Sequence, residues 1–399
     1  MILTSLYIHI PFCIHRCGYC DFNTYAGLQR LIPAYSQALR VEIEYLSQSA
    51  MEQLVIQTIY FGGGTPSLLP ENDLESILVT IGNHFNLLPS VEITIEANPG
   101  TVSKAYLRKI NSLGVNRISL GMQSADQTEL RLLERQHSFD DVVRAVEWSR
   151  SAGINNLNLD LIFGLPHQEL QTWLNTLEAA MSLQPEHLSL YAFTLEHGTP
   201  MQHKVDNGKL PESDPDVAAD MYEAASERLA AGGFVQYEIS NWARVDNLAG
   251  LYSCEHNLQY WRNLPYLGVG AGAHGFINHY RTVDISTPGA YIKRMGDKSE
   301  RNKARHLFPR TPATVKLNYV DEDAEIGETM MMGLRLVLEG ISKHQFEHRF
   351  GINLQERFSA QIDRLISLGL LEWNSTQDKR LRLTQKGHLL GNQVFREFI

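Results

Sequence analysis

Cysteine is scarce in this chain of 399 residues, which has four, at positions 13, 17, 20 and 254. A disulfide framework that stabilises a small secreted fold needs more cysteines, spread along a short chain. Three of the four instead share the short stretch from 13 to 20. In a reducing compartment such a group is typical of metal ligands. The cysteine pattern therefore predicts a metal centre near the N-terminus.

Long apolar runs and an excess of basic residues are also missing. No run approaches the roughly 18–20 apolar residues of a membrane span. The first residues, MILTSLYIHIPFC, lack the basic segment and long apolar stretch of a signal peptide. The formal net charge of −10 provides no overall basic field for nucleic acid. We therefore expect a cytoplasmic protein that does not bind nucleic acid, and peripheral membrane contact stays open.

The first two-thirds of the chain alternates short β-rich runs with amphipathic helical stretches. This alternation predicts a parallel sheet with right-handed crossovers. Six units are too many for a small open fold and too few for a closed eight-fold barrel. We therefore expect an α/β fold with a partial (β/α)6 barrel. The expected strands are Leu6–Ile10, Thr58–Phe61, Val91–Glu96, Arg117–Leu120, Asn156–Ile162 and His187–Phe193, and the expected helices are Ile32–Ser47, Leu74–Phe85, Lys104–Leu113, Phe139–Ala152 and Leu170–Ser182.

From about residue 200 the pattern changes. Residues 204–215 are polar and predict a loop, and 237–279 are rich in Tyr, Trp, Asn, His and Gly, which predicts loops that build a site. The end of the chain reads as three helices, a short hairpin and a last helix, which predicts a small winged-helix-like α+β domain. We expect a barrel with its closing loops over 1–285, a connection over 286–324 and the small domain over 325–399. This domain lacks a marked Lys/Arg stripe, and its fold alone does not imply DNA binding.

The three clustered cysteines have the spacing Cys13-x3-Cys17-x2-Cys20, directly after a predicted strand. Three thiolates on one short loop can each bind one iron of a [4Fe–4S] cluster, which leaves the fourth iron without a protein thiolate. A closed zinc site with His15 as the fourth ligand is the alternative. However, His15 lies inside the tight loop, and structural zinc sites usually draw their ligands in two separated pairs. We therefore expect a [4Fe–4S] cluster.

Polar or glycine-rich residues follow several predicted strands. In parallel barrels the chemistry gathers at these carboxyl ends of the strands. Glycines let the backbone approach a ligand closely, and a carboxylate can accept hydrogen bonds from a ribose or pair with an ammonium group. The alternative for each residue is a polar group that only completes the hydrogen bonds of a strand end. The candidate binding residues are Gly63, Gly64, Thr65, Glu96, Gln123, Arg135 and Asp160.

The cysteine spacing after the first barrel strand resembles the signature of the radical SAM superfamily, and Gly62–Pro66 resembles its GGE-type motif. The resemblance implies that the open iron chelates S-adenosylmethionine (SAM), and that the reduced cluster cleaves SAM to a 5′-deoxyadenosyl radical. The order of the strand-end residues is similar to that of the oxygen-independent coproporphyrinogen III oxidase group, whose matching positions contact SAM. Whether a second SAM binds stays open. The residues that this resemblance assigns to SAM are Tyr7, Tyr19, Gly63, Gly64, Thr65, Glu96, Gln123, Arg135 and Asp160.

Two departures point to one branch of that group. The coproporphyrinogen dehydrogenases carry a further cysteine two positions after the third cluster cysteine, where this chain has Phe22. They also have an N-terminal extension, whereas here the cluster loop begins by residue 13. Both features resemble the HemW branch of haem chaperones, and His256–Trp261 matches the HNxxYW motif of that branch. The resemblance implies haem ligation by His256, with Cys254 as an alternative ligand and a purely hydrogen-bonded His256 as the other alternative.

The sequence thus predicts a radical SAM protein that binds haem and passes it to haem-accepting proteins. Its cofactors would be a [4Fe–4S] cluster, SAM and haem, and an electron donor such as a flavodoxin or ferredoxin would reduce the cluster. The alternative is a coproporphyrinogen III dehydrogenase that decarboxylates two propionates oxidatively. A scaffold with a zinc loop is the third hypothesis. Whether SAM is cleaved in function, and hence whether the protein is an enzyme, stays open.

Overall fold

The computed structural model describes residues 1–246, 250–299, 308–374 and 378–399. Contacts divide the chain into two compact units. The first comprises Met1–Ala225 and Pro265–Asn318, and the second comprises Ser226–Leu264 and Tyr319–Ile399. The domain limits expected from the sequence, at 285 and 325, stay predictions, because compactness alone does not establish which segments fold independently.

A row of six parallel strands forms the centre of the first unit. The strands lie in the order β8-β7-β6-β5-β4-β1, and each pairs in parallel with its neighbours. All six expected strands are present, and β1, β4 and β5 begin earlier than expected. Their bounds are β1 Ile2–Ile10, β4 Leu54–Gly63, β5 Asn86–Ala97, β6 Arg117–Gln123, β7 Asn156–Phe163 and β8 His187–Ala192. This arrangement confirms the expected partial barrel.

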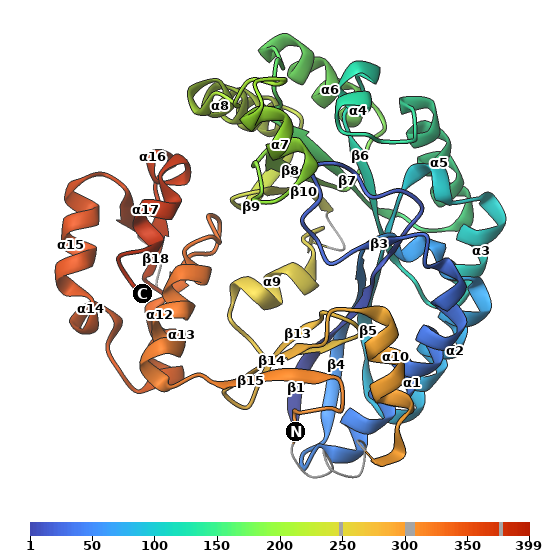
Figure 1. Ribbon diagram of the computed structural model, residues 1–399. Helices are drawn as coiled ribbons and strands as arrows, with labels where there is room; N and C mark the ends of the chain where they lie inside the picture. The colour runs from blue at the N-terminus through green and yellow to red at the C-terminus, as the bar shows by residue number, and fades with distance from the viewer. Residues whose placement is uncertain (247–249, 300–307, 375–377) are drawn as a thin grey trace. The chain divides into compact units, whose positions relative to one another are not determined.

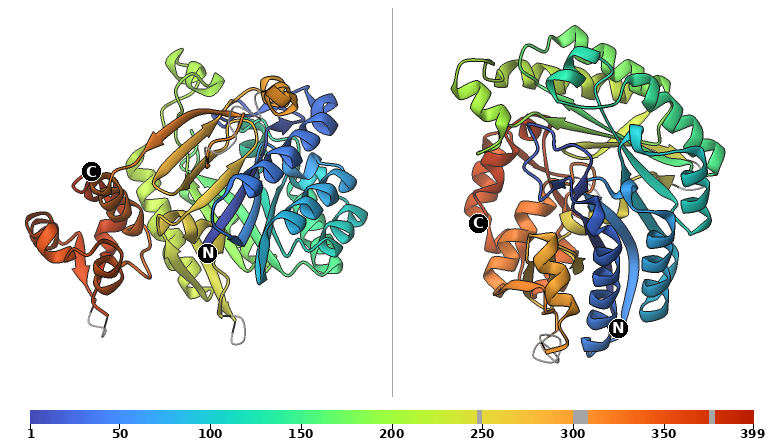
Figure 2. Two further views of the ribbon diagram at one scale, coloured as in Figure 1. Left: turned by 90° about the horizontal axis from the view of Figure 1, so that it is seen from below. Right: turned by 45° about the vertical axis from the view of Figure 1, so that its right-hand side comes forward.

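Helices between these strands cover the outer face of the curved sheet (Figures 1 and 2). Helix α5 shows why they form. Ser138 and Asp141 make a capping box at its start, and Gly153 ends it with a φ of 95°. Its buried residues recur at helical spacing, so one face packs inward. The helices are α1 Ile32–Ser49, α2 Glu71–His84, α3 Lys104–Ser112, α4 Gln127–Leu132, α5 Phe139–Ala152 and α6 Leu170–Ser182.

The remainder of the first unit extends the sheet beyond β1. Strand β12 pairs with β1 in parallel, and β13 and β14 follow as antiparallel neighbours. Residues 237–279 were expected to form loops, but they contain several short strands and a helix. These elements are too short to show a clear hydrophobic period in the sequence. The expected loop over 204–215 begins inside α7. These elements are β2 Phe12–Cys13, β3 Tyr25–Ala26, α7 Pro200–Asp206, α8 Pro215–Ala231, β12 Tyr266–Val269, β13 His274–Ile277, β14 Tyr280–Asp284, α10 Pro288–Gly296 and β15 Thr314–Tyr319.

The second unit has its own hydrophobic core, formed mainly by the end of the chain. Strands β16, β18 and β17 form a small sheet in that order, and the expected hairpin β17–β18 is present. Between residues 322 and 367, four helices precede this hairpin where three were expected. No helix in the described ranges is long and apolar enough to cross a membrane. The elements are β9 Phe234–Glu238, β10 Asn241–Asp246, β11 Gly250–Leu251, α9 Glu255–Trp261, α12 Glu322–Gly333, β16 Ile341–Ser342, α13 Lys343–Phe350, α14 Leu354–Arg357, α15 Ser359–Ser367, β17 Leu371–Trp373, β18 Arg380–Leu383, α16 Gln385–Leu389 and α17 Gly391–Phe395.

Candidate functional site

The loop with the three clustered cysteines is fixed at both ends. Its start, β2, pairs in parallel with β3 beyond the loop, so the chain returns to the point where it left. The Gln29 side chain donates a hydrogen bond of 2.7 Å to the Cys13 carbonyl. Within the loop, the Cys20 N–H donates to the Cys17 carbonyl at 3.1 Å. These contacts hold the loop in a compact form over the carboxyl ends of the strands.

The glycine run at the end of β4 contacts the start of the cysteine loop through backbone hydrogen bonds. The Gly64 N–H donates to the Ile10 carbonyl and the Thr65 N–H to the Phe12 carbonyl, both at 2.8 Å. A Cβ atom at position 64 would lie 2.7 Å from the Phe12 carbonyl oxygen and 3.0 Å from the Cys13 Sγ. Only glycine fits this close approach. The glycine therefore allows the backbone after β4 to lie directly under the first cysteine.

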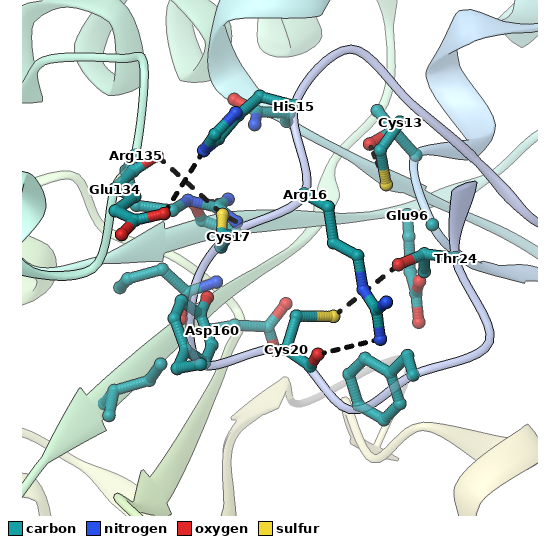
Figure 3. A pocket seen from close by; sticks show the side chains of 18 of the residues that line it. Cys13, His15, Arg16, Cys17, Cys20, Thr24, Glu96, Glu134, Arg135 and Asp160 are labelled. Carbon is teal, nitrogen blue, oxygen red and sulfur yellow. Dashed lines mark hydrogen bonds and ion pairs between the residues drawn. The ribbon is translucent and has the colours of Figure 1, made fainter. Parts of the chain in front are cut away.

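The three thiols lie on one loop at a pocket of about 550 Å³, which they help to line (Figure 3). The Cys20 Sγ is 3.8 Å from the Thr24 Oγ1, and the Arg135 Nη1 is 3.9 Å from the Cys17 Sγ. Burial raises the pKa of the Cys13 and Cys17 thiols, and the Arg135 cation opposes this rise at Cys17. A bound metal reverses such a shift, since thiolates are the ligating form. The donor set is therefore three soft sulfur ligands, each with its own polar neighbour.

The geometry favours a cluster over a single zinc ion. Three thiolates on one loop can each bind a different iron of a [4Fe–4S] cluster, whereas a structural zinc site needs a fourth protein ligand on the same ion. His15, the fourth zinc ligand in the alternative, instead lies 3.4 Å from the Glu134 Oε2 with its Nε2 (Figure 3). The three cysteines thus fit the expected cluster.

Glu96, at the end of β5, is the best-supported carboxylate in the pocket. Its Oε1 accepts a hydrogen bond of 2.8 Å from the Tyr60 hydroxyl, and its Oε2 accepts one of 3.0 Å from the Gly63 N–H. Burial and, second, the negative charge of Asp160 raise the Glu96 pKa to about 7. A cationic ligand beside Glu96 would favour its ionised form. The site can therefore bind an ammonium or hydroxyl donor here.

Asp160 lies on β7, which is separated from β5 by β6, and it lines the same pocket as Glu96. Its two oxygens accept hydrogen bonds from the Ser119 hydroxyl at 2.7 Å and from the Asn158 amide at 2.8 Å. Burial raises the pKa of this carboxyl despite those hydrogen bonds. Two carboxyl groups on separate strands thus face one polar pocket, which is suited to a ligand rich in N–H and O–H groups.

Arg135 closes the side of the pocket near Cys17. Its Nη2 donates to the Gly121 carbonyl at 3.0 Å, and a Cβ atom at position 121 would lie only 2.8 Å from that nitrogen. Gln123, at the end of β6, has a φ of 64°. This left-handed conformation turns the chain sharply after the strand. The Arg135 guanidinium therefore offers a fixed positive charge to an anionic group in the pocket.

The pocket brings together most of the residues predicted to bind the cluster and SAM. Tyr7 and His256 are not among the described residues that line it. The Tyr7 hydroxyl lies 3.0 Å from the His9 Nδ1, and the Tyr7 ring stacks on the ring of Tyr60. Tyr60 lines the pocket, so Tyr7 packs against a residue of the pocket wall. The predicted residues that do line the pocket are Cys13, Cys17, Tyr19, Cys20, Gly63, Gly64, Thr65, Glu96, Gln123, Arg135 and Asp160.

His256 belongs to the second unit, on helix α9. Its side chain is buried, with 1% exposure, and its Nε2 lies 2.8 Å from the Tyr260 hydroxyl. The two rings meet edge to face, with centroids 5.0 Å apart. The spacing of four residues in HNxxYW thus places a histidine and a tyrosine on one face of a helical turn.

Tyr60, Ser119 and Glu134 are among the pocket residues that the sequence analysis missed. Tyr60 and Ser119 each donate a hydrogen bond to one of the two pocket carboxylates, and both lie inside strands that were recognised. Their places on β4 and β6, shortly before the strand ends, were the available signal. Glu134 also lines the pocket, and its carboxylate contacts Lys204 at 3.0 Å and His15 at 3.4 Å. Neither of these partners is near Glu134 in the sequence, so no local pattern indicated it.

The fold and the site define a radical SAM protein, and comparisons with known proteins agree. Residues 7–180 match the Radical SAM superfamily, and residues 320–390 match the HemN C-terminal domain. Membership of this superfamily implies a [4Fe–4S] cluster and SAM as cofactors. The solved structure described as coproporphyrinogen III oxidase (HemN) from Escherichia coli, a radical SAM enzyme, has a TM-score of 0.81. It covers 100% of this chain and 90% of its own, at 22% identity, and this similarity concerns the fold.

More similar sequences identify the family within that class. Heme chaperone HemW of Bacillus subtilis is 36% identical over 100% of this chain and 99% of its own length. Heme chaperone HemW of Mycobacterium tuberculosis (strain H37Rv) is 35% identical over 99% of this chain and 94% of its own length. The chain belongs to the HemW family. The expected branch is therefore confirmed.

Proposed function

We propose that this protein is a haem chaperone, which binds haem and delivers it to haem-accepting proteins. The observation that carries the proposal is the identity of 36% to Heme chaperone HemW of Bacillus subtilis along the whole of both chains. At the position of the further cysteine expected in a coproporphyrinogen dehydrogenase, this chain has Phe22. Its side chain is 65% exposed and lines the pocket. A phenyl ring there supplies no thiol to the site.

The pocket residues divide the binding of the cofactors among them. Cys13, Cys17 and Cys20 would hold the [4Fe–4S] cluster, which supplies one-electron reduction of SAM when both are bound. Glu96 would accept hydrogen bonds from the polar groups of SAM. The Arg135 guanidinium, held by the Gly121 carbonyl, would pair with an anionic group in the pocket. Other pocket residues that would contact SAM are Tyr19, Gly63, Gly64, Thr65, Gln123 and Asp160.

His256 would ligate the haem iron through its imidazole. In the structure its Nε2 faces the Tyr260 hydroxyl, so ligation by this atom requires the hydroxyl to move aside.

The test is a haem titration of the full chain, reconstituted anaerobically with iron and sulfide. We expect a saturable haem spectrum for the wild type and much weaker binding for His256→Ala. His344→Ala is the matched control, because His344 is an exposed histidine on helix α13 of the same unit. The absence of a saturable spectrum in the wild type would overturn the proposal. Equal haem binding by His256→Ala and His344→Ala would show that His256 is not the ligand of the haem iron.

Coproporphyrinogen III oxidation is the alternative, favoured by the shared fold with the Escherichia coli oxidase. An anaerobic assay with coproporphyrinogen III, SAM and a reductant separates the two functions. We expect no multiple-turnover formation of protoporphyrinogen. We also propose a cytoplasmic location and a small electron-transfer protein such as a flavodoxin or ferredoxin as reductant, because free thiols that hold an iron–sulfur cluster persist in a reducing compartment and the cluster needs an electron source.

A further inference from the structure

Helix α9, which carries His256, is built into the second unit. Its residues Leu258 and Trp261 pack in a small apolar cluster that also contains Tyr237 and Leu336. Tyr237 precedes the helix in the sequence, whereas Leu336 follows it by about 75 residues, near the end of α12. The helix therefore rests on segments from both sides of the sequence. Its orientation depends on contacts that the HNxxYW motif itself does not contain.

Side chains from the end of the chain contact the carboxyl end of α9. The Glu339 carboxylate accepts hydrogen bonds from the Arg262 guanidinium at 2.7 and 3.2 Å. Arg349, on α13, donates to the Arg262 carbonyl at 3.2 Å through Nη1 and to the Asn263 carbonyl at 2.8 Å through Nη2. The same Nη2 contacts the Glu325 Oε1 on α12 at 2.6 Å. One guanidinium thus joins the end of α9 to two helices of the C-terminal segment.

The geometry explains why an arginine stands at this position. A guanidinium offers several N–H groups in a fixed plane, so it can serve two carbonyl groups and a carboxylate at once. Glu325 is 6% exposed, which makes its pairing with Arg349 important for a buried charge. A positive charge is also favourable beside the last carbonyls of a helix. A lysine would keep the charge but could not reach all three acceptors.

Two further contacts support the same end of the helix. The Asn263 side chain donates to the Thr329 Oγ1 at 3.0 Å and weakly to the Glu325 carbonyl at 3.4 Å. The Arg335 guanidinium lies 4.3 Å from the centre of the Trp261 ring, within cation–π distance. All of these partners lie on or beside α12. The end of α9 is therefore fixed in position and in rotation about its axis.

We propose that Arg349 is a positioning residue for haem binding, which fixes helix α9 so that His256 and Tyr260 present their side chains in one defined arrangement. The inference rests on the proposed function, because it assumes that His256 is the haem ligand. Arg349 itself does not touch the haem in this account. It acts through the carbonyl groups that follow α9, nearly two helical turns after His256.

The experiment compares haem affinity and the spectrum of bound haem in full-length, anaerobically reconstituted Arg349→Lys and wild type. We expect the dissociation constant to rise by about 10- to 100-fold, as for other residues that orient a metal ligand, with a changed spin state of the occupied sites. The matched control is Arg357→Lys. Arg357 pairs with Asp323 in the same unit, but both are exposed, at 44% and 82%. We expect this control to bind haem like the wild type.

The spectrum distinguishes positioning from general stability. A variant that only lowers the folded fraction would bind less haem in total, but its occupied sites would keep the affinity and spectrum of the wild type. That result, or wild-type binding by Arg349→Lys, would overturn the inference. If Arg349→Lys does not fold, Thr329→Val decides, since it removes the acceptor of the Asn263 side chain, while its other lost hydrogen bond, from the Thr329 hydroxyl to the Glu325 carbonyl at 2.7 Å, lies within α12. We expect a weakening of a few-fold in Thr329→Val, and wild-type affinity there would contradict the inference.

His256→Ala, measured in parallel, separates this inference from the proposed function. If His256→Ala binds haem as well as the wild type, the proposed ligand is wrong and the inference fails with it. If His256→Ala loses binding while Arg349→Lys retains it, the proposed function stands and only the positioning role is refuted. Loss of affinity in both variants, with an unchanged control, supports both.

Discussion

Replacement of Gly64 by alanine should displace the cluster loop. The new Cβ would lie 2.7 Å from the Phe12 carbonyl oxygen and 3.0 Å from the Cys13 Sγ. The carbonyl cannot simply retreat, because it accepts a hydrogen bond of 2.8 Å from the Thr65 N–H. The backbone must therefore shift, and the first cluster cysteine must move with it.

The expected cost is that of forcing a methyl group into filled space, about 1–3 kcal/mol. For a unit or chain of this size, each kcal/mol lowers the melting temperature by about 1–2 °C. The displaced thiol should also lower the iron and sulfide content after anaerobic reconstitution, because ligand geometry limits cluster assembly. The measurements are the content of iron and acid-labile sulfide per chain and the absorbance of the cluster at about 400 nm.

Gly100→Ala is the matched control. Gly100 lines the same pocket, but a Cβ atom there would meet its nearest neighbours at 3.8 and 3.9 Å, which is ordinary contact. We expect this variant to keep both its cluster content and its stability. A full complement of iron and sulfide in Gly64→Ala, with an unchanged melting temperature, would refute the reasoning about the close approach.

Three further changes test the electrostatics of the site. In the metal-free protein, burial raises the pKa of Glu96 from its ordinary value of 4.5 to about 7. Protonated Glu96 therefore stabilises the fold at low pH, and this contribution to stability is lost as the pH rises through 7. Urea unfolding at pH 5 and pH 7.5 should show less pH dependence in Glu96→Gln, and equal dependence would contradict this. Lys204→Met should change the free energy of unfolding by less than about 1 kcal/mol, because the side chains of the Lys204–Glu134 ion pair are 41% and 31% exposed. A larger loss of stability in thermal unfolding would contradict the treatment of this pair as a solvent-screened ion pair. Arg135→Lys should weaken SAM binding by about tenfold, a loss of 1.4 kcal/mol, since an ammonium cannot hold the Gly121 carbonyl and face the ligand together; equilibrium dialysis with unchanged affinity would exclude this role.

The barrel was predictable because its signals are local. Strands such as β7, with its alternate buried leucines, and helices such as α5, with a capping box and a terminal glycine, contain their own structural information. The cluster loop and the glycine run were recognisable for the same reason. Each is a short pattern in which residue type and spacing alone determine what the segment can bind.

The parts that escaped prediction depend on contacts between distant residues. Residues 237–279 appeared as loops because their strands are short and rich in residues of mixed polarity, so no hydrophobic period stands out. The same limit hid the role of Arg349, which lies 86 residues after Asn263 but binds its carbonyl. Tyr60 was hidden differently, since an aromatic residue in a strand is usually part of the core. Only the structure shows that its hydroxyl contacts Glu96.

The central claim is that this member of the HemW family handles haem rather than oxidising coproporphyrinogen. One anaerobic preparation, with its iron and sulfide counted, can be offered haem in one sample and coproporphyrinogen III with SAM and reductant in another. The account predicts saturable haem binding that His256→Ala weakens, and no repeated formation of protoporphyrinogen. Multiple turnovers to protoporphyrinogen, without saturable haem binding, would contradict it.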